Sequence, residues 1–325
     1  MRFPSGSLCR GAPQAQFALR LALAVTMSGG FYVAGIALAP LATPLLLLVP
    51  LPGLILAADS PAAPSVWLLL SAAAVGLTLG TGAVASWLLL FGLPACSLAL
   101  GCRRRWSFEA TAMAGVVVWS AGLAISSVLA YGDLTTLVTT VREQLAGGVD
   151  LALSTYSSVG VSDSNVAAVQ AERDILVNGL LEILPALVVL SGALMVIVNL
   201  VLLRRWTSLS HEIDLRLWRT PEPLIWALIV AGFAMFLPVY PLALAARNVF
   251  IVLLGCYFCQ GLAIVSYFLE RLRLPYGVRV AGYLLIAVQH IVAGIVLALG
   301  VFDLWGNFRR PSAGAADMQI PGDGE

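Results

Sequence analysis

The residues that could carry enzymatic chemistry fall into a few short motifs. Cys256 and Cys259 form a C-x-x-C, a spacing used in redox and metal sites, but they lie in an apolar segment, where thiols stay protonated and inert. His211 and Glu212 begin an H-E-x-x-H zinc motif, which Leu215 breaks. No G-x-S-x-G nucleophile motif occurs in the sequence. We therefore predict that the chain is not an enzyme and binds no metal or cofactor.

The basic residues are all arginine, because the sequence holds 18 Lys plus Arg and no Lys. This excludes the P-loop route of ATP hydrolysis, which needs a lysine on the phosphates, and Schiff-base chemistry. The net charge of +1 leaves no large basic surface, so no nucleic-acid partner is expected.

A second set of candidates consists of polar residues within apolar segments: Glu182, Asn199, Arg247, Asn248, Gln260, Gln289 and His290. Such side chains are costly in lipid and usually face a bundle interior or a cavity. We predict a substrate pocket that includes Gln260 and His290, with Asn248 nearby. Glu182 and Arg247 are predicted to form an ion pair near the outer surface, within the same substrate-binding set. Hydrogen bonding between helices, without any ligand, is the alternative explanation and the favoured one.

The elements that must position these residues are membrane helices. Of the 325 residues, 60% are hydrophobic and 11% charged, with a mean hydropathy of +0.95. A soluble domain is nearer 25% charged, and so few charged groups would not cover a soluble surface. The composition predicts an all-α polytopic transmembrane helix bundle, with the lipid bilayer as its partner.

Seven windows without Asp, Glu or Arg define the crossings: 21–58, 60–102, 110–132, 183–203, 223–246, 248–269 and 280–302. A crossing needs about 20 apolar residues. The first two windows are long enough for two helices each, with breaks at Pro40 and Pro44 and at Gly80 to Gly82. This predicts nine crossings, the first four near 21–38, 42–57, 66–80 and 83–101. Eight is the alternative, if 42–57 or 66–80 is re-entrant.

Arginine placement predicts the orientation. With nine crossings, 13 of the 18 Arg fall on the side of the N-terminus. The positive-inside rule then places the N-terminus in the cytoplasm. The Arg-rich start and the apolar run after it resemble a signal peptide, but we expect an uncleaved first helix because the apolar stretch continues.

Residues 133–174 form a predicted extracytoplasmic loop with six acidic residues and two Arg. Leu134, Leu137, Val138, Val141 and Leu145 recur at helical spacing and predict an amphipathic helix. Gly147 and Gly148 are expected to end that helix, before a second short piece at 151–158. The apolar stripe could lie on the membrane surface or cap the bundle, and capping is favoured.

The predicted organisation has five parts. They are a cytoplasmic N-terminal segment (1–20), N-terminal transmembrane helices (21–132), the amphipathic loop (133–174), C-terminal transmembrane helices (175–305) and a disordered tail (306–325).

Several short runs resemble one bacterial family. They are Pro223-Leu224-Ile225-Trp226, Asn248, Tyr257 to Val265, Leu299 to Trp305 with Phe308-Arg309, Leu184-Pro185-Ala186 and Pro50-Leu51-Pro52. In this order they resemble the YybS-like polytopic membrane proteins, a domain of unknown function, over about residues 20–310. The resemblance implies a bacterial cytoplasmic-membrane protein. The hydrophobic architecture is also similar to the substrate-capture subunits of energy-coupling-factor importers, which borrow ATPases from partners.

Two functional hypotheses follow. The first is a transport-related substrate-binding membrane subunit that works with a soluble ATPase module. The alternative is a membrane scaffold that binds envelope or division proteins through the amphipathic loop or the charged segment 204–221.

Overall fold

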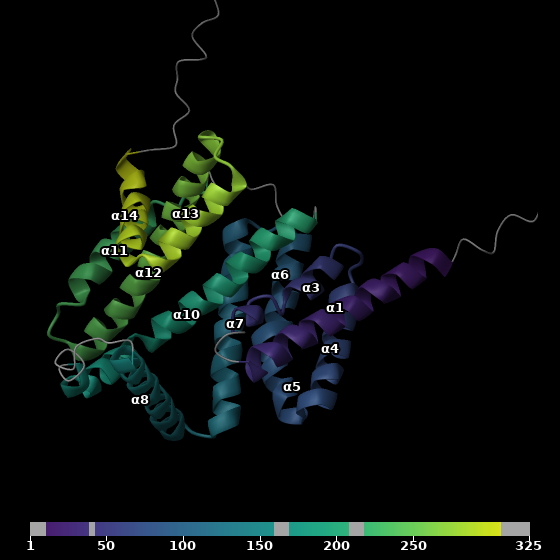
Figure 1. Ribbon diagram of the computed structural model, residues 1–325, viewed down its shortest axis with the longest axis horizontal. Helices are drawn as coiled ribbons and strands as arrows, with labels where there is room; N and C mark the ends of the chain where they lie inside the picture. The colour runs from purple at the N-terminus through teal and green to yellow at the C-terminus, as the bar shows by residue number, and fades with distance from the viewer. Residues whose placement is uncertain (1–10, 39–42, 159–168, 208–217, 307–325) are drawn as a thin grey trace, which may run out of the picture. The chain divides into compact units, whose positions relative to one another are not determined.

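The computed structural model describes residues 11–38, 43–158, 169–207 and 218–306, which form helices, turns and no strands. The predicted tail after Gly306, the motif at His211, and the first ten residues lie outside this part of the chain. The helices form two compact units, residues 1–212 and 213–325 (Figure 1). The predicted all-helical class is thus confirmed for the described residues.

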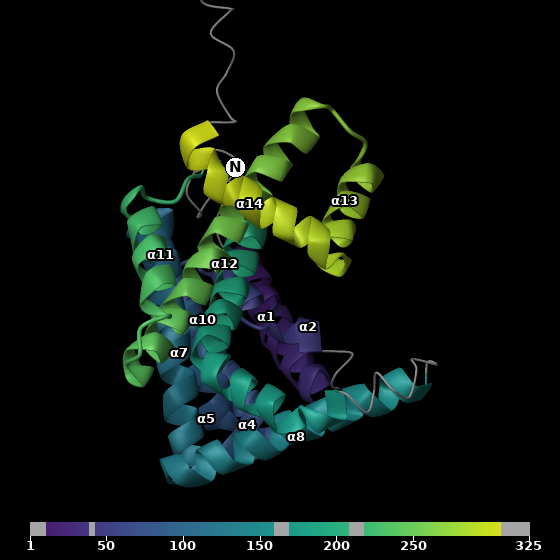
Figure 2. The same ribbon diagram turned by 90° about the vertical axis from the view of Figure 1, so that its left-hand side faces the viewer.

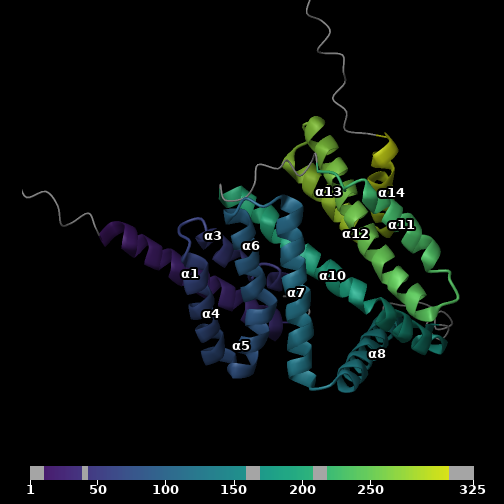
Figure 3. The same ribbon diagram turned by 180° about the vertical axis from the view of Figure 1, so that it is seen from behind.

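The first unit holds the helices α1 (Gly11–Ala37), α2 (Thr43–Leu46), α3 (Leu51–Leu56), α4 (Ala63–Leu79), α5 (Thr81–Trp87), a π-helical turn η1 (Leu88–Gly92), α6 (Leu93–Arg103), α7 (Phe108–Tyr131), α8 (Leu134–Ser158) and α10 (Arg173–Trp206). Figure 3 shows α4, α5, α6 and α7 side by side. The second unit holds α11 (Pro223–Ala234), α12 (Tyr240–Arg271), α13 (Tyr276–Val288) and α14 (His290–Gly306).

Five helices of the described residues are long and apolar enough to cross a membrane: Gln14–Ala37, Thr81–Arg103, Phe108–Tyr131, Arg173–Trp206 and Tyr240–Arg271. A sixth span is counted if α13 and α14, which are bent by 100° relative to each other, act together. The nine predicted crossings, and the alternative of eight, are therefore not confirmed. Three of the predicted segments are shorter apolar helices, at Pro44–Leu56, Ala63–Leu79 and Pro223–Ala234.

The break predicted at Gly80 to Gly82 is found at Gly80, which has a φ of +87° and separates α4 from α5, whereas Thr81 and Gly82 already belong to α5. Beyond it the chain stays helical through η1, where the amide N–H of Leu93 donates to the carbonyl of Leu88, five residues earlier. A wider π turn at this place accommodates Pro94, which has no N–H for the regular ladder. Residues 81–103 therefore form one long apolar segment.

Two predicted boundaries in the second unit were wrong. The windows place a break at Arg247, but α12 runs through Arg247, and the chain turns instead between Ala234 and Tyr240, around Pro238. Proline interrupts a helix, whereas a long arginine side chain does not. The last window is not one helix either, because the chain bends at Gln289.

The core of the first unit is built around two fully buried indoles. The rings of Trp67 on α4 and Trp87 on α5 lie 5.4 Å apart between centroids. Gly53 on α3 lies against Trp67, and a Cβ there would come within 2.5 Å of the ring. Arg103 at the end of α6 donates to the carbonyl of Ala57 at 2.6 Å. Together these contacts fix α3 against α4 and α6.

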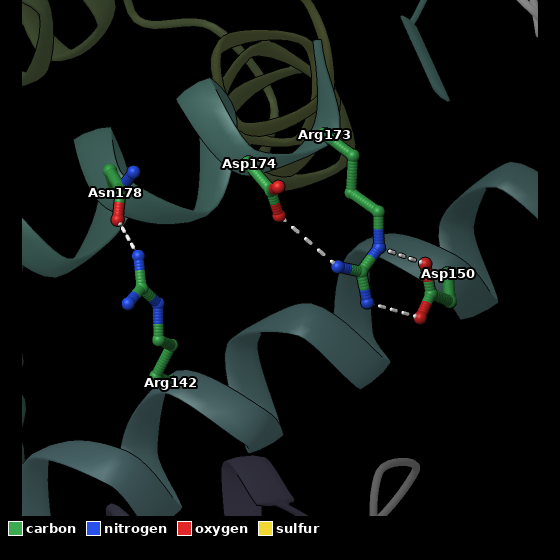
Figure 4. Close-up of polar contacts among 5 residues, drawn as sticks. All are labelled: Arg142, Asp150, Arg173, Asp174 and Asn178. Carbon is green, nitrogen blue, oxygen red and sulfur yellow. Dashed lines mark hydrogen bonds and ion pairs between the residues drawn. The ribbon is translucent and has the colours of Figure 1, made fainter. Parts of the chain in front are cut away.

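The helix α8 follows α7 after a short turn and is bound to α10 by side-chain hydrogen bonds. Gly132 ends α7 with a φ of +80°, and Asp133 accepts a hydrogen bond from the backbone N–H of Thr136 at 2.8 Å, which caps the new helix. Further along, Arg142 donates to Asn178, and Arg173 donates to both carboxylate oxygens of Asp150 at 2.6 and 2.7 Å (Figure 4).

The prediction that Gly147 and Gly148 end the amphipathic helix was wrong, because α8 is continuous to Ser158. A glycine inside a helix costs only about 1 kcal/mol. The side chains of Arg142 and Asp150 bind α10 on either side of the two glycines, which holds both halves of α8 on the same partner.

We expect Gly122→Ala to destabilise the first unit. An added Cβ at Gly122 on α7 would lie 2.2 Å from the carbonyl oxygen of Leu89, so α7 and η1 must separate. The expected loss is on the order of 1–3 kcal/mol, measured as a lower melting temperature of the detergent-purified protein. Gly30→Ala is the matched control, because a Cβ there meets nothing within 4 Å. An equal melting temperature for both variants would show that the close approach is absent.

The ion pair between Asp150 of α8 and Arg173 of α10 should weaken in acid. The hydrogen bond from Arg173 lowers the pKa of Asp150, so its stabilising effect is present above the unfolded-state pKa of about 3.9 and is lost as the pH falls through the lower folded-state pKa. We expect hydrogen-exchange protection of residues 146–158, corrected for intrinsic rates, to hold from pH 7 to 5 and to drop below about pH 4.

The Asp150→Asn variant should lack this acid step, whereas Glu143→Gln on the same helix should keep it. The readout is restricted to the second half of α8 because Thr136 hydrogen bonds also lower the pKa of Asp133 at its first turn. An acid step that survives in Asp150→Asn would assign the pH dependence to another group.

Candidate functional site

The candidate site of the second unit begins with the crossing of α12 and α14. A Cβ on Gly261 would lie 1.9 Å from the carbonyl oxygen of Val296, and a Cβ on Gly300 would lie 1.9 Å from that of Tyr257. Only glycine permits the two backbones to come this close. The crossing encloses the side chains beside it, and Tyr257 is buried there with Ile225 of α11.

Gln260 precedes Gly261 and is 2% exposed. Its Nε2 donates to the Oδ2 of Asp303 on α14 at 3.1 Å. Its Oε1 accepts from the backbone N–H of Thr220 at 3.0 Å and from the Thr220 hydroxyl. One amide thus connects α12, α14 and the segment that leads into α11.

Asp303 is fully buried, and Arg219 Nε lies 4.0 Å from its Oδ2. The Arg219 side chain is 47% exposed, so its guanidinium offsets the carboxylate charge from a position that solvent reaches. A buried carboxylate needs a counter-charge and hydrogen bonds, or it takes up a proton. The cluster of Arg219, Thr220, Gln260 and Asp303, which we call the polar cluster, therefore holds a charge-compensated buried carboxylate inside an apolar unit.

The structure does not bring Gln260 and His290 together. His290 is exposed at the first position of α14. Asp303, the partner of Gln260, lies 13 residues later on the same helix, about 20 Å along its axis. Any binding role of His290 is therefore separate from the polar cluster.

The remaining predicted residues lie on two different units. Glu182 is half-buried on α10 in the first unit, and Arg247 is half-buried on α12 in the second. Their predicted ion pair stays a prediction. Asn248 donates to the carbonyl of Leu244 at 3.0 Å, one turn earlier on its own helix, a bond that does not require a ligand.

Asn199 on α10 is fully buried, and its Nδ2 donates to the carbonyls of Leu47 and Met195 at 2.7 Å each. Asn199 thus connects α10 to the turn after α2. This is the hydrogen bonding between helices, without a ligand, that the sequence analysis gave as the alternative explanation. Cys256 and Cys259 are half-buried free thiols on α12. Within the described ranges no group of three or more His, Cys, Asp or Glu could hold a metal ion.

Sequence reasoning missed Asp303 and Thr220. Reading the chain as charge-free windows makes every acidic residue a boundary, so Asp303 marked the end of the window 280–302. The signal that could have found it is the apolar run on its N-terminal side together with Gly300 one turn earlier. Small residues at helix contacts bring neighbouring polar side chains within reach of each other.

The residues that build the polar cluster fall inside the range matched by a family model. The model is described as "Predicted membrane protein (DUF2232)", and it matches residues 30–304. This chain belongs to the DUF2232 family. No curated protein and no solved structure matches it. The family membership makes this DUF2232 protein a membrane protein, in agreement with its five to six candidate spans.

We expect the polar pair of this DUF2232 protein to behave as a coupled unit. Gln260→Leu removes a donor from the buried Asp303 and should cost about 1–3 kcal/mol. The double variant Gln260→Leu with Asp303→Leu should recover part of that loss, because no buried carboxylate remains. Thermal unfolding in detergent, followed by tryptophan fluorescence, measures both. Gln289→Leu, at an exposed glutamine, is the control; strictly additive losses would show that the pair is not coupled.

Proposed function

We propose that this DUF2232 protein is a transport-related, substrate-binding subunit of the bacterial inner membrane, without enzymatic or ATPase activity of its own. The observation that carries the proposal is the buried hydrogen bond between Gln260 and Asp303. Ionisable residues within membrane segments usually mark substrate, ion or proton pathways. The resemblance to substrate-capture subunits of energy-coupling-factor importers supports a soluble ATPase module as partner, since the sequence has no lysine for a P-loop.

The proposed orientation places the N-terminus in the cytoplasm. Within the first unit, Arg103 to Arg105 and Arg204 to Arg205 are separated by two candidate spans, α7 and α10, so both clusters fall on one side. The acidic segment 133–174 falls on the other. The positive-inside rule assigns the arginine side to the cytoplasm and supports α8 as extracytoplasmic. The nine-crossing topology stays a prediction within this proposal.

The polar cluster suits a small molecule with hydrogen-bond donors. Asp303 is the acceptor, because the Oε1 of Gln260 already accepts two hydrogen bonds from Thr220, and the half-exposed Arg219 marks the side from which a ligand would reach it. A ligand whose donor group is cationic can displace Arg219 and keep the carboxylate of Asp303 paired, so exchange of the two cations costs less than leaving the charge unpaired.

The test is native mass spectrometry of the full-length protein, gently purified from native membranes into nanodiscs. We expect a bound small molecule or a stoichiometric ATPase module with the wild type and with Gln289→Ala. The affinity for the bound molecule should fall about tenfold with Gln260→Ala, equivalent to one lost hydrogen bond of about 1.4 kcal/mol, and ligand occupancy should fall with it. Gln289→Ala removes the same side chain from an exposed position.

Equal ligand occupancy in the two variants would overturn the assignment of the site. Recovery of envelope or division proteins in fixed stoichiometry, with no ligand, would overturn the transport proposal and favour the scaffold hypothesis instead.

A further inference from the structure

The position of α8 is set by the membrane helix before it. Tyr131 is the last residue of α7, a candidate span, and α8 begins only three residues later at Leu134. Figure 2 shows α8 leaving the end of α7 and running crosswise to it. The first turns of α8 therefore lie at the level where α7 leaves the membrane, and Tyr131 is an aromatic residue typical of that level.

A second candidate span fixes the rest of the helix. Arg142 donates to Asn178, and Asp150 accepts from Arg173 (Figure 4). Asn178 and Arg173 lie in the first two turns of α10. Because α8 is continuous, these bonds and its short connection to α7 hold residues 134–150 beside the ends of two candidate spans.

One face of α8 is apolar and carries neither Arg142 nor Asp150, the residues that hydrogen-bond α10. This face is the predicted apolar stripe, which consists of Leu134, Leu137, Val138, Val141 and Leu145. Leu134 is 69% and Val138 47% exposed, whereas Leu137, Val141 and Leu145 are half-buried. At about 100° per residue, the stripe lies roughly a third of a turn away from the face that carries Arg142 and Asp150. The polar side chain of Glu143 lies on the side opposite the stripe.

We propose that α8 is an interfacial helix that inserts its apolar stripe into the surface of the bilayer crossed by α7 and α10. An amphipathic helix held parallel to a membrane buries its apolar face at the boundary of headgroups and acyl chains. The bilayer lies next to both places where α8 is attached, the end of α7 and the start of α10. The apolar stripe can therefore insert into lipid without a protein partner having to bind first. This inference is independent of the proposed transport function, and it replaces the bundle cap favoured by the sequence pattern.

The test uses site-directed spin labels on the full-length protein in phosphatidylcholine vesicles. The five native Cys are replaced by Ser, and a single label is placed through Val138→Cys or Leu145→Cys on the stripe. Glu143→Cys supplies the matched control on the opposite side of the same helix. Collisions with oxygen, which concentrates in lipid, are compared with collisions with a water-soluble nickel chelate.

We expect the ratio of oxygen to nickel collisions to be at least about threefold higher at Val138 and Leu145 than at Glu143, as for helices at a membrane surface. Equal, nickel-dominated ratios at all three positions would place α8 in water and overturn the proposal. Protection of the stripe labels from both reagents would show that protein covers the stripe and would overturn it as well. Two stripe positions are used so that a local distortion from one label does not decide the result.

Discussion

Close approach of helix backbones at glycine is the constraint on which the described structure depends. Lipid tails are as apolar as leucine, so helices in a bilayer gain little from burying leucine against each other and associate through tight packing and hydrogen bonds. In the second unit, Gly261 and Gly300 leave no room for a side chain between α12 and α14. In the first unit, Gly122 does the same between α7 and η1. The polar cluster exists only because such a crossing encloses it: with a larger residue at position 261, the backbones would separate and Gln260 would lose Asp303.

The chemistry of Asp303 and the packing of glycine are thus two aspects of one arrangement. A carboxylate that is fully buried in a low-dielectric interior is strongly disfavoured unless donors reach it. Gln260 reaches it from α12, and its other end is held by Thr220. Because the amide is fixed at both ends, it presents a donor to Asp303 without further loss of side-chain entropy. Arg219 adds charge from the half-exposed side, which makes that contact the part of the cluster that changes most easily.

Short-range sequence patterns, such as glycine positions and apolar periodicity, predicted several helices and helix ends of the fold. The break predicted at Gly80 to Gly82 follows from glycine and was placed within three residues, and the amphipathic pattern of 134–145 predicted a helix. Gln260 was predicted to share a substrate pocket with His290; it is buried, but the residue it hydrogen-bonds on α14 is Asp303. Boundaries drawn by charge failed at Arg247, because an arginine at the edge of an apolar segment can extend its guanidinium to a polar level while its helix continues. The continuity of α8 through Gly147 and Gly148 depends on bonds to α10, which lies far along the chain and leaves no local signal.

The bend between α13 and α14 bears on the depth of the polar cluster. Gln289 has an extended backbone, so the first amide N–H groups of α14 have no carbonyl before them in a helix. In hydrocarbon each such group would cost several kcal/mol, and Gln289 and His290 are both exposed. The bend therefore belongs where water, headgroups or protein supply acceptors. Asp303 lies about 20 Å from this bend along α14. The helix therefore starts at an exposed polar turn and buries its single acidic residue about four turns away, against Gln260.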